Sequence, residues 1–298
     1  MSVIIASNCV AGYSLETVPG SATAAASDLG LVTTATLNED NSENSYFGIG
    51  SDTRLAYKAG LVELSGSLDT IVSGSVIPML AVTRTVGLLG SYTLEIGNAG
   101  APWRFIGSKF NNLRLSCGPG LDAVLTSTMD FMALNATAGA YDPTPNATAL
   151  DDSIWAPYEC VIQVGSTGAE YAFDTEAISF NTSLANNITG LPRASSSVLY
   201  GMPVRGYRSL SEGNAVITGE IVTYEDPGVT TVLADCPGTD IDVSFTFTNV
   251  CTSGTPSNLV ISLVDCGFGA VSQRINAGDP VEFTVGLTAE SILISGGA

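Results

Sequence analysis

The feature that most constrains this chain is a strict alternation of apolar and polar residues that appears in both of its halves. In the segment 62–69, every second residue is polar or acidic, ending at Asp69, and the residues between are apolar or glycine. The segments 92–96 and 242–248 alternate in the same way. A period of two indicates β-strands with one buried face and one face in solvent. The chain is therefore predicted to form antiparallel sheets.

The alternating segments recur in the same order at nearly constant spacing, with apolar positions falling on apolar positions. The matched segments are 34–37 with 181–184, 62–68 with 215–221, 79–80 with 232–233, 92–95 with 245–248 and 129–131 with 281–283. Ordered self-similarity of this kind is typical of an internal duplication. We expect one domain at 1–150, which includes an N-terminal arm, and its duplicate at 151–298.

Each half is predicted to contain the same series of elements. In the first half, strands are expected near 30–37, 61–71, 91–97, 103–117 and 122–134, with a long polar loop at 38–56 and a short helix near 75–85. In the second half, strands are expected near 159–164, 171–186, 214–224, 240–250, 258–265 and 280–288, with a loop at 187–208 and a helix near 227–235. Asp226 is a natural N-cap for the second helix, and Pro227 suits its first turn. The predicted fold is mainly β, with two tandem antiparallel β-sandwich or barrel domains that each carry a short helix.

The residue inventory leaves little room for catalysis. The chain has no histidine, so the commonest general base is missing and a Ser-His-Asp triad is excluded. No nucleophile elbow, dinucleotide fingerprint or phosphate loop is present. The six cysteines form no Cys-x-x-Cys pair, so we expect structural thiols, with a disulfide in the second half as the alternative. We therefore expect no enzyme, no cofactor and no metal site. The adjacent acids Asp151 and Asp152 are better explained by a linker between the repeats than by a glycosidase.

The charge balance argues against nucleic-acid binding. The 29 acidic residues outnumber the 10 basic ones, for a formal net charge of −19. Such a surface repels phosphate rather than releasing counterions from it. Adaptation to high salt is a second explanation for the same composition. No apolar run reaches the length of a membrane-spanning helix, and the first residues lack the basic start of a secretory signal.

Several blocks, read in order, resemble the tail tube proteins of siphovirus-type tailed viruses. The blocks are the acid-rich loop that leads to 50–54, the strand 61–68, the run 91–96, the long segment 103–116 and the strand that ends at 128–131. The resemblance extends over roughly residues 30–290 and is one of pattern and order. It implies a ring whose inner wall is a continuous β-barrel, stacked into a hollow tube that conducts viral DNA. Six tube domains per ring are usual in that family, so two domains per chain imply a trimer with pseudo-sixfold symmetry; a hexamer is the alternative.

The resemblance also assigns roles to particular residues. Polar strand positions are expected to line the lumen, where an acidic wall lets DNA pass without specific binding: Glu63, Asp69, Glu95, Asp130, Glu220 and Glu282. The two long loops are expected to reach the adjacent ring, with Glu39, Asp40, Glu43, Arg54, Arg193 and Arg205 as stacking candidates. The implied partners are copies of the chain itself and the tail terminator, tail-tip and tape-measure proteins, with no membrane. The implied location is the virion tail, after synthesis in the host cytoplasm.

Two other classes of protein are compatible with the same residues. One is a different β-rich virion component, such as a capsid decoration or tail-tip protein. The other is a surface-layer or adhesin protein with two sandwich domains. In either case the acidic strand positions are the solvated faces of an ordinary sandwich.

Overall fold

In the computed structural model, strands make up most of the residues that the structure describes. These residues are 9–23, 27–47, 54–72, 80–85, 88–98, 102–118, 123–138, 154–165, 171–173, 177–192, 198–199, 202–203, 207–224, 241–248, 258–277 and 281–296. Helical structure within them is confined to residues 80–82 and the 3-10 turn η2 (Pro157–Glu159). A mainly β, antiparallel fold is confirmed.

The first half of the chain forms two sheet layers that share the long strand β8. One layer has the order β2-β1-β7-β8-β10, and the other has the order β3-β4-β9-β8. The bounds are β1 (Cys9–Leu15), β2 (Ser27–Asp28), β3 (Leu31–Phe47), β4 (Arg54–Ile71), β7 (Tyr92–Asn98), β8 (Trp103–Cys117), β9 (Thr126–Ala133) and β10 (Asn135–Ala138). We call this set of strands the first unit.

The second half, here called the second unit, repeats both layers. The layer with the order β12-β11-β19-β20-β23 corresponds to the first layer of the first unit. The layer with the order β13-β18-β22-β21 corresponds to the second. The bounds are β11 (Cys160–Gly165), β12 (Tyr171–Phe173), β13 (Ala177–Ala185), β18 (Val216–Tyr224), β19 (Asp242–Thr248), β20 (Asn258–Val264), β21 (Gly267–Arg274), β22 (Glu282–Ala289) and β23 (Ser291–Gly296). Short ladders complete the described strands: β5 (Arg84–Thr85) with β6 (Leu88–Leu89), β14 (Thr189–Pro192) with β17 (Tyr207–Ser211), and β15 (Val198–Leu199) with β16 (Met202–Pro203).

Irregularities in the strands recur at equivalent places in the two units. The register of β3 on β4 shifts between Val32 and Thr34, and that of β13 on β18 shifts between Ala177 and Ser179. Local bulges of this kind are specific features of a strand, so their recurrence marks the same position in each unit. The registers through these bulges make Gly219 the counterpart of Gly66, as the sequence comparison predicted.

The other sequence matches are displaced from the structural correspondence by an even number of residues. The registers make Ser179 the counterpart of Thr34, whereas the sequence match aligned Thr34 with Asn181. They likewise make Val285, rather than Val281, the counterpart of Met129. An even slip keeps every side chain on its own face, so alternation alone does not detect it. Of the match of 79–80 with 232–233, only Leu80 is among the described residues.

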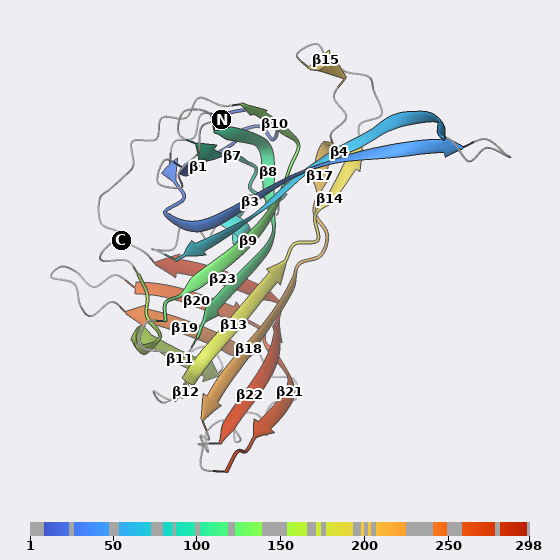
Figure 1. The fold of residues 1–298 in the computed structure, drawn as a ribbon. Helices are drawn as coiled ribbons and strands as arrows, with labels where there is room; N and C mark the ends of the chain where they lie inside the picture. Colours follow the sequence, from blue (N-terminus) through green and yellow to red (C-terminus); the bar gives the residue numbers. More distant parts are fainter. Residues whose placement is uncertain are drawn as a thin grey trace.

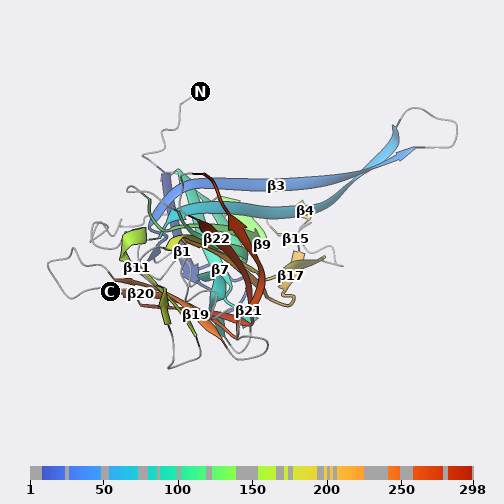
Figure 2. The same cartoon turned by 90° about the horizontal axis from the view of Figure 1, so that it is seen from below.

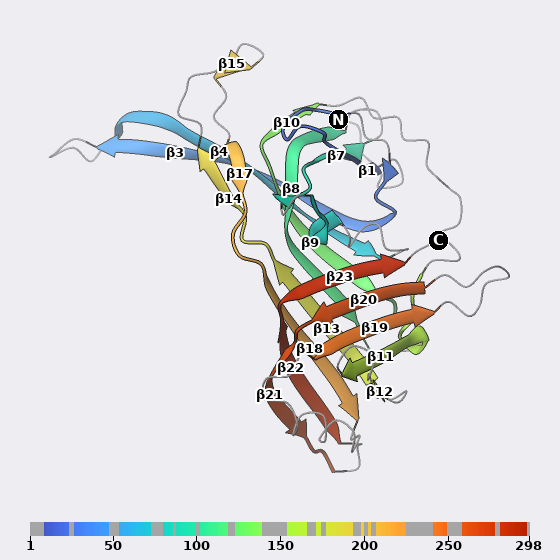
Figure 3. The ribbon, with the colours of Figure 1, turned by 180° about the vertical axis from the view of Figure 1, so that it is seen from behind.

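The two units are joined into one sheet because β8 pairs with β13. The strands β3-β4-β9-β8-β13-β18-β22-β21, which we call the joined sheet, run side by side across the molecule (Figure 1). The layer of β11, β19, β20 and β23 packs over one face of this sheet, as the view from behind shows (Figure 3). The predicted boundary at 150/151 lies outside the described residues.

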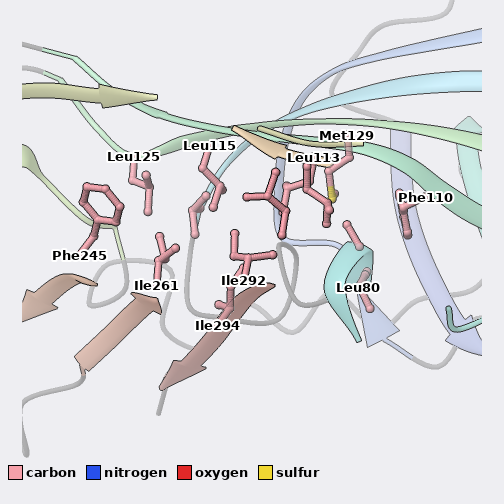
Figure 4. Close-up of a cluster of buried hydrophobic side chains, with 14 of the residues drawn as sticks. Leu80, Phe110, Leu113, Leu115, Leu125, Met129, Phe245, Ile261, Ile292 and Ile294 are labelled. Atoms are coloured by element: carbon pink, nitrogen blue, oxygen red, sulfur yellow. The ribbon is translucent and has the colours of Figure 1, made fainter. Parts of the chain in front are cut away.

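The main hydrophobic core lies between these layers and contains residues of both units. In Figure 4, Leu113, Leu115 and Met129 of the joined sheet point toward Ile261 and Ile292 of the opposite layer. All five side chains are buried. Burial of this apolar area removes it from water, which is the main stabilising term for such a sandwich. The side of the joined sheet that faces this core is its core face, and the other side is its polar face.

Two predicted loops were wrong, because both contain paired strands. Residues 38–56 belong largely to β3 and β4, which form a long arm that projects from the body (Figure 2). The polar composition of this segment suggested a loop, but a two-stranded ribbon satisfies its backbone groups without an apolar face. The segment 187–208 contains β14, β15 and β16 and the start of β17.

The short elements were predicted less well than the long strands. The first helix is described only at 80–82 and gives way to β5 at Arg84; the second, near 227–235, lies outside the described residues. Strands β1, β21 and β23 were not predicted. Because Cys9–Leu15 pairs with β7 as strand β1, this part of the expected N-terminal arm belongs to the body.

Candidate functional site

The strand registers define one polar surface that runs across both units, the polar face of the joined sheet. Paired strands place Ser, Thr and Asn side chains along it, for example Ser67 beside Asp130 and Asn181 beside Ser116. The acids on this face are Asp40, Glu63, Asp69, Asp130, Glu220 and Glu282. The exposed bases on it are Arg114 and Arg274, whereas Lys109, opposite Met132 on the same side of β8, is buried. The face is therefore hydrophilic and carries an excess of negative charge.

Neighbouring strands hold several of these carboxylates in place. Thr128 Oγ1 donates a hydrogen bond of 2.8 Å to Asp69, and Asn112 Nδ2 donates one of 2.9 Å to Asp130. These cross-strand bonds fix the acids on the surface of the sheet while leaving them partly exposed to solvent. The Arg274 and Glu282 side chains lie 3.8 Å apart and are 72% and 36% exposed, so that pair adds little stability.

The junction between the two units is a fully paired antiparallel ladder. Strand β13 pairs with β8 over six positions, from Phe180 opposite Cys117 to Ala185 opposite Asn112. Phe180, Leu184, Leu113 and Cys117 are all buried on the core face. The sheet therefore continues from one unit to the next without a gap in its hydrogen bonding.

Just beyond the last pair of this ladder, Asn186 stabilises the junction through several hydrogen bonds. Its backbone N–H donates to Asn111 O at 2.7 Å, and its Nδ2 donates to Phe110 O at 3.0 Å and Ala81 O at 3.1 Å. Its Oδ1 accepts a bond from the Arg84 guanidinium at 3.1 Å. Asn186 is completely buried, and this network satisfies its polar groups there.

A buried ion pair also links the second unit to the first. The Glu212 carboxylate pairs with the Lys109 ammonium, and their side chains are 7% and 11% exposed. The same carboxylate accepts hydrogen bonds from the Leu89 backbone N–H, at 2.9 and 3.0 Å, and from Arg84 at 3.5 Å. A buried carboxylate with this many donors is compensated for its lost hydration.

At its two ends, the joined sheet has strands that pair on one side only within the described residues. Strand β3 pairs only with β4, and β21 pairs only with β22. Val271 is 46% exposed, and Ile275, just past the end of β21, is 69% exposed. Unpaired edges that carry exposed apolar side chains invite another strand.

A scan against models of protein families matches residues 72–290 to the phage tail tube proteins. The chain belongs to the phage tail tube protein family. The match runs from just after β4 to the turn after β22, so it covers the later strands of the first unit and all but β23 of the second. None of the curated proteins compared with the chain matches it.

Membership of this family makes the tail tube protein a structural component of the virion tail. The family's structural role argues for a protein without enzymatic function. The described residues hold no group of three or more His, Cys, Asp or Glu side chains placed to bind a metal ion. In the same part of the chain, no helix has both the length and the apolar character that a membrane crossing needs.

Five of the six predicted lumen residues of the tail tube protein lie on the polar face: Glu63, Asp69, Asp130, Glu220 and Glu282. Glu63 differs from the rest because its hydrogen bond, of 3.1 Å from Tyr207 Oη, comes from β17, a strand outside the joined sheet that lies against the middle of β4. The described strands thus place on one face acids that are as far apart in sequence as 63 and 282.

The sixth residue, Glu95, lies elsewhere. It belongs to β7, is 1% exposed and forms an ion pair with Arg104, so it is not on the polar face. Alternation suggested a solvated face for β7, yet Thr93 is buried as well. The reason is the segment after β1, whose buried Glu16 carboxylate accepts hydrogen bonds from Ser91 and Thr93 at 2.8 Å each. Sequence alternation did not reveal this cover.

The stacking candidates fall on the arm or outside the described residues. Glu39, Asp40 and Glu43 lie in β3, and Arg54 begins β4. Arg193 and Arg205 lie outside the described residues. The arm of this tail tube protein projects well beyond the body in two views (Figures 1 and 2).

Cys117, Cys160 and Cys266 are free thiols. Cys117 and Cys266 are buried, and Cys160 is partly buried. Burial raises the pKa of Cys117 to about 12 and that of Cys266 to about 11, and it raises the pKa of Cys160 still further. These groups therefore stay protonated at neutral pH and behave as small hydrophobic side chains.

Proposed function

We propose that this tail tube protein is the ring subunit of a hollow tail tube that conducts viral DNA. In this proposal each chain supplies two tube domains, one per unit, and three chains form a ring with pseudo-sixfold symmetry. The rings stack into the tube, and the polar faces of the joined sheets form the wall of the lumen.

The observation that carries the proposal is the continuation of one sheet across both units. The β8–β13 ladder joins two copies of the same four-stranded layer edge to edge. The free edges of β3 and β21 lie at opposite ends of the joined sheet. A sheet with two open ends loses its unpaired edges when copies close into a ring, as in a closed barrel. Such joining from head to tail generates rings when the rotation closes.

The chemistry of the polar face suits passage of DNA without binding. Its hydroxyl and amide groups are neutral, and its acids outnumber its bases. A phosphate backbone near such a wall is repelled within a Debye length of roughly 8–10 Å and gains nothing from counterion release. Asp69, Asp130, Glu220 and Glu282 are our candidates for the wall itself.

The arm and the ends of the tube supply the remaining contacts of the proposal. The arm of β3 and β4, with Glu43 and Arg54, extends beyond the body and is proposed to contact the adjacent ring. Copies of the chain itself, the tape-measure protein, the tail terminator and the tail-tip protein are the proposed partners, and synthesis in the host cytoplasm is part of the same proposal.

The number of subunits in the ring is the first test. Native mass spectrometry of the smallest closed assembly should give three chains of 30.6 kDa, and electron microscopy should show hollow rods. A ring of six chains would contradict the two-domain interpretation. A stable monomer that never assembles, alone or with other tail proteins, would contradict the tube itself.

Charge reversal on the polar face tests the lumen. Glu220→Lys combined with Glu282→Lys should leave tubes assembled and slow DNA ejection, because the wall gains sites that attract phosphate. Glu290→Lys is the matched control, because Glu290 is exposed in the turn between β22 and β23. Normal kinetics of DNA ejection in the double variant would show that the polar face does not line the lumen.

A further inference from the structure

We propose that β21 of one chain pairs with β3 of the next chain in the register that β8 and β13 already have within the chain. The inference deepens the proposed function and rests on it, because it names the residues that meet where two subunits join. The within-chain junction is the template, and the structural equivalence of the two units supplies the alignment.

Strand β3 takes the place of β13. The two strands pair with the equivalent strands β4 and β18, and both carry the bulge described above. The registers on β4 and β18 align Ala35 with Phe180, Asn38 with Ser183 and so on along the strand. The side of β3 that points away from β4 is therefore the counterpart of the β13 edge that joins β8.

Strand β21 takes the place of the second part of β8. The registers on β9 and β22 align Val271 with Leu113 and Arg274 with Ser116. The residues just before these strands agree with the alignment. Gly107 and Asp265 both have a positive φ, at 68° and 52°. The next residue in each unit, Ser108 or Cys266, donates a side-chain hydrogen bond to the carbonyl three positions earlier, at 3.3 and 3.4 Å.

Transferring the β8–β13 register to these strands gives the pairs between chains. On the core face, Ala35 lies opposite Ile275, Leu37 opposite Gln273 and Glu39 opposite Val271. On the polar face, Thr36 lies opposite Arg274 and Asn38 opposite Ser272. The two strands lie at opposite ends of the joined sheet, so the pairing takes place between two copies of the chain.

Side-chain size is complementary across one of the proposed pairs. Within the chain, the large Phe180 lies opposite the small Cys117; between chains, the small Ala35 lies opposite the larger Ile275. The exposed Ile275 would thus become covered in a position whose counterpart, Cys117, is only 2% exposed. Each of the two pairs therefore combines one larger and one smaller apolar side chain.

The hydrogen-bond pattern identifies which pairs are close enough to cross-link. Asn186 N–H donates to Asn111 O, which makes that pair a hydrogen-bonded one. Because the two classes of pair alternate along an antiparallel ladder, Ser183 and Arg114 form a non-hydrogen-bonded pair, the class with the closest side chains. Their counterparts Asn38 and Ser272 are both exposed in the single chain and are suited to a disulfide.

The test is a full-length double variant, Asn38→Cys with Ser272→Cys, assembled and then oxidised. It should give covalent trimers on a non-reducing gel. Asn38→Cys with Gln273→Cys places the thiols on opposite faces, and Asn38→Cys with Arg274→Cys places them on a diagonal beyond disulfide reach. Neither control should cross-link. Ser183→Cys with Arg114→Cys should close a disulfide within the chain and calibrates the oxidation, and the unmodified chain gives the background of the native cysteines.

The outcomes separate this inference from the proposed function. Cross-linked trimers from the 38/272 variant alone support the register. Rings of normal mass that cross-link in a control variant, or that do not cross-link at 38/272 while 183/114 does, overturn the register and leave the ring intact. Failure of the unmodified chain to form rings overturns both. If a double variant does not fold, the density of β3 and β21 in an image reconstruction of the unmodified tube decides the register directly.

Discussion

The β8–β13 junction and the free edges of β21 and β3 are equivalent positions of one repeated fold in different surroundings. At the junction, Leu113 is 1% exposed, whereas its counterpart Val271 is 46% exposed. The junction also has the buried Lys109–Glu212 pair, and the registers put Gly267 in the place of Lys109. The contrast teaches that a few side chains decide whether the same position of one fold is covered within the chain or left exposed at its edge.

The largest expected effect comes from removing one partner of the buried ion pair. Glu212→Ala leaves the Lys109 ammonium buried without its counter-charge and the Leu89 N–H without its acceptor. We expect a loss of about 3–5 kcal/mol in the free energy of unfolding. Denaturant unfolding of the isolated chain measures it. Arg274→Ala removes an exposed pair and should change stability by less than about 0.5 kcal/mol; equal losses would mean that the junction is not specially stabilised.

Truncation of the two equivalent apolar residues sharpens the contrast. Leu113→Ala creates a cavity at the covered junction and should cost about 2–5 kcal/mol. Val271→Ala should cost under about 1 kcal/mol in the isolated chain, because Val271 is already half exposed. In assembled tubes, however, Val271→Ala should lower the dissociation temperature. Similar losses for both variants in the isolated chain would show that β21 is already covered.

The equivalent glycines of the two units should differ in their tolerance of a methyl group. A Cβ on Gly66 would lie 2.5 Å from the Phe131 ring and 2.8 Å from Thr36 O, so Gly66→Ala should cost about 1–3 kcal/mol. A Cβ on Gly219 would lie 2.9 Å from a methyl of the flexible Leu287 side chain, so Gly219→Ala should cost less. Thermal unfolding of both variants gives the order, and the reverse order would contradict the packing described for these strands.

The smallest expected effect is a loss of stability at alkaline pH from the junction thiol. Burial raises the pKa of Cys117 from 9.0 to about 12. Above pH 9 the unfolded chain ionises this thiol while the folded chain does not, so its contribution is complete below pH 9 and is lost as pH rises toward 12. The loss should reach about 1 kcal/mol by pH 10. Stability of the Cys117→Ala variant, measured across the same range, should fall less steeply; parallel curves would mean that Cys117 ionises normally.

The candidate site was only partly predictable from sequence. The acids of the polar face followed from alternation, since Glu63 and Asp69 share a strand with a strict period of two. Glu95 has the same alternation but is buried, because Glu16 and Arg104 come from distant parts of the chain. The sequence did not reveal the roles of Asn186 and Glu212 at the junction, because a single Asn or Glu next to a strand is common and does not indicate a buried polar contact.

What the sequence by itself determined is the face of each long strand. Alternation is local, and the period of two survives insertions and even slips, so the strands near 61–71, 103–117 and 258–265 were predicted correctly. What only the tertiary structure decided is register and partner. Hydrogen bonds between strands far apart in the chain decide whether Met129 corresponds to Val281 or to Val285, and which edge of the sheet stays unpaired. A slip of two residues changes those bonds but not the pattern of apolar side chains, so the sequence alone does not distinguish them.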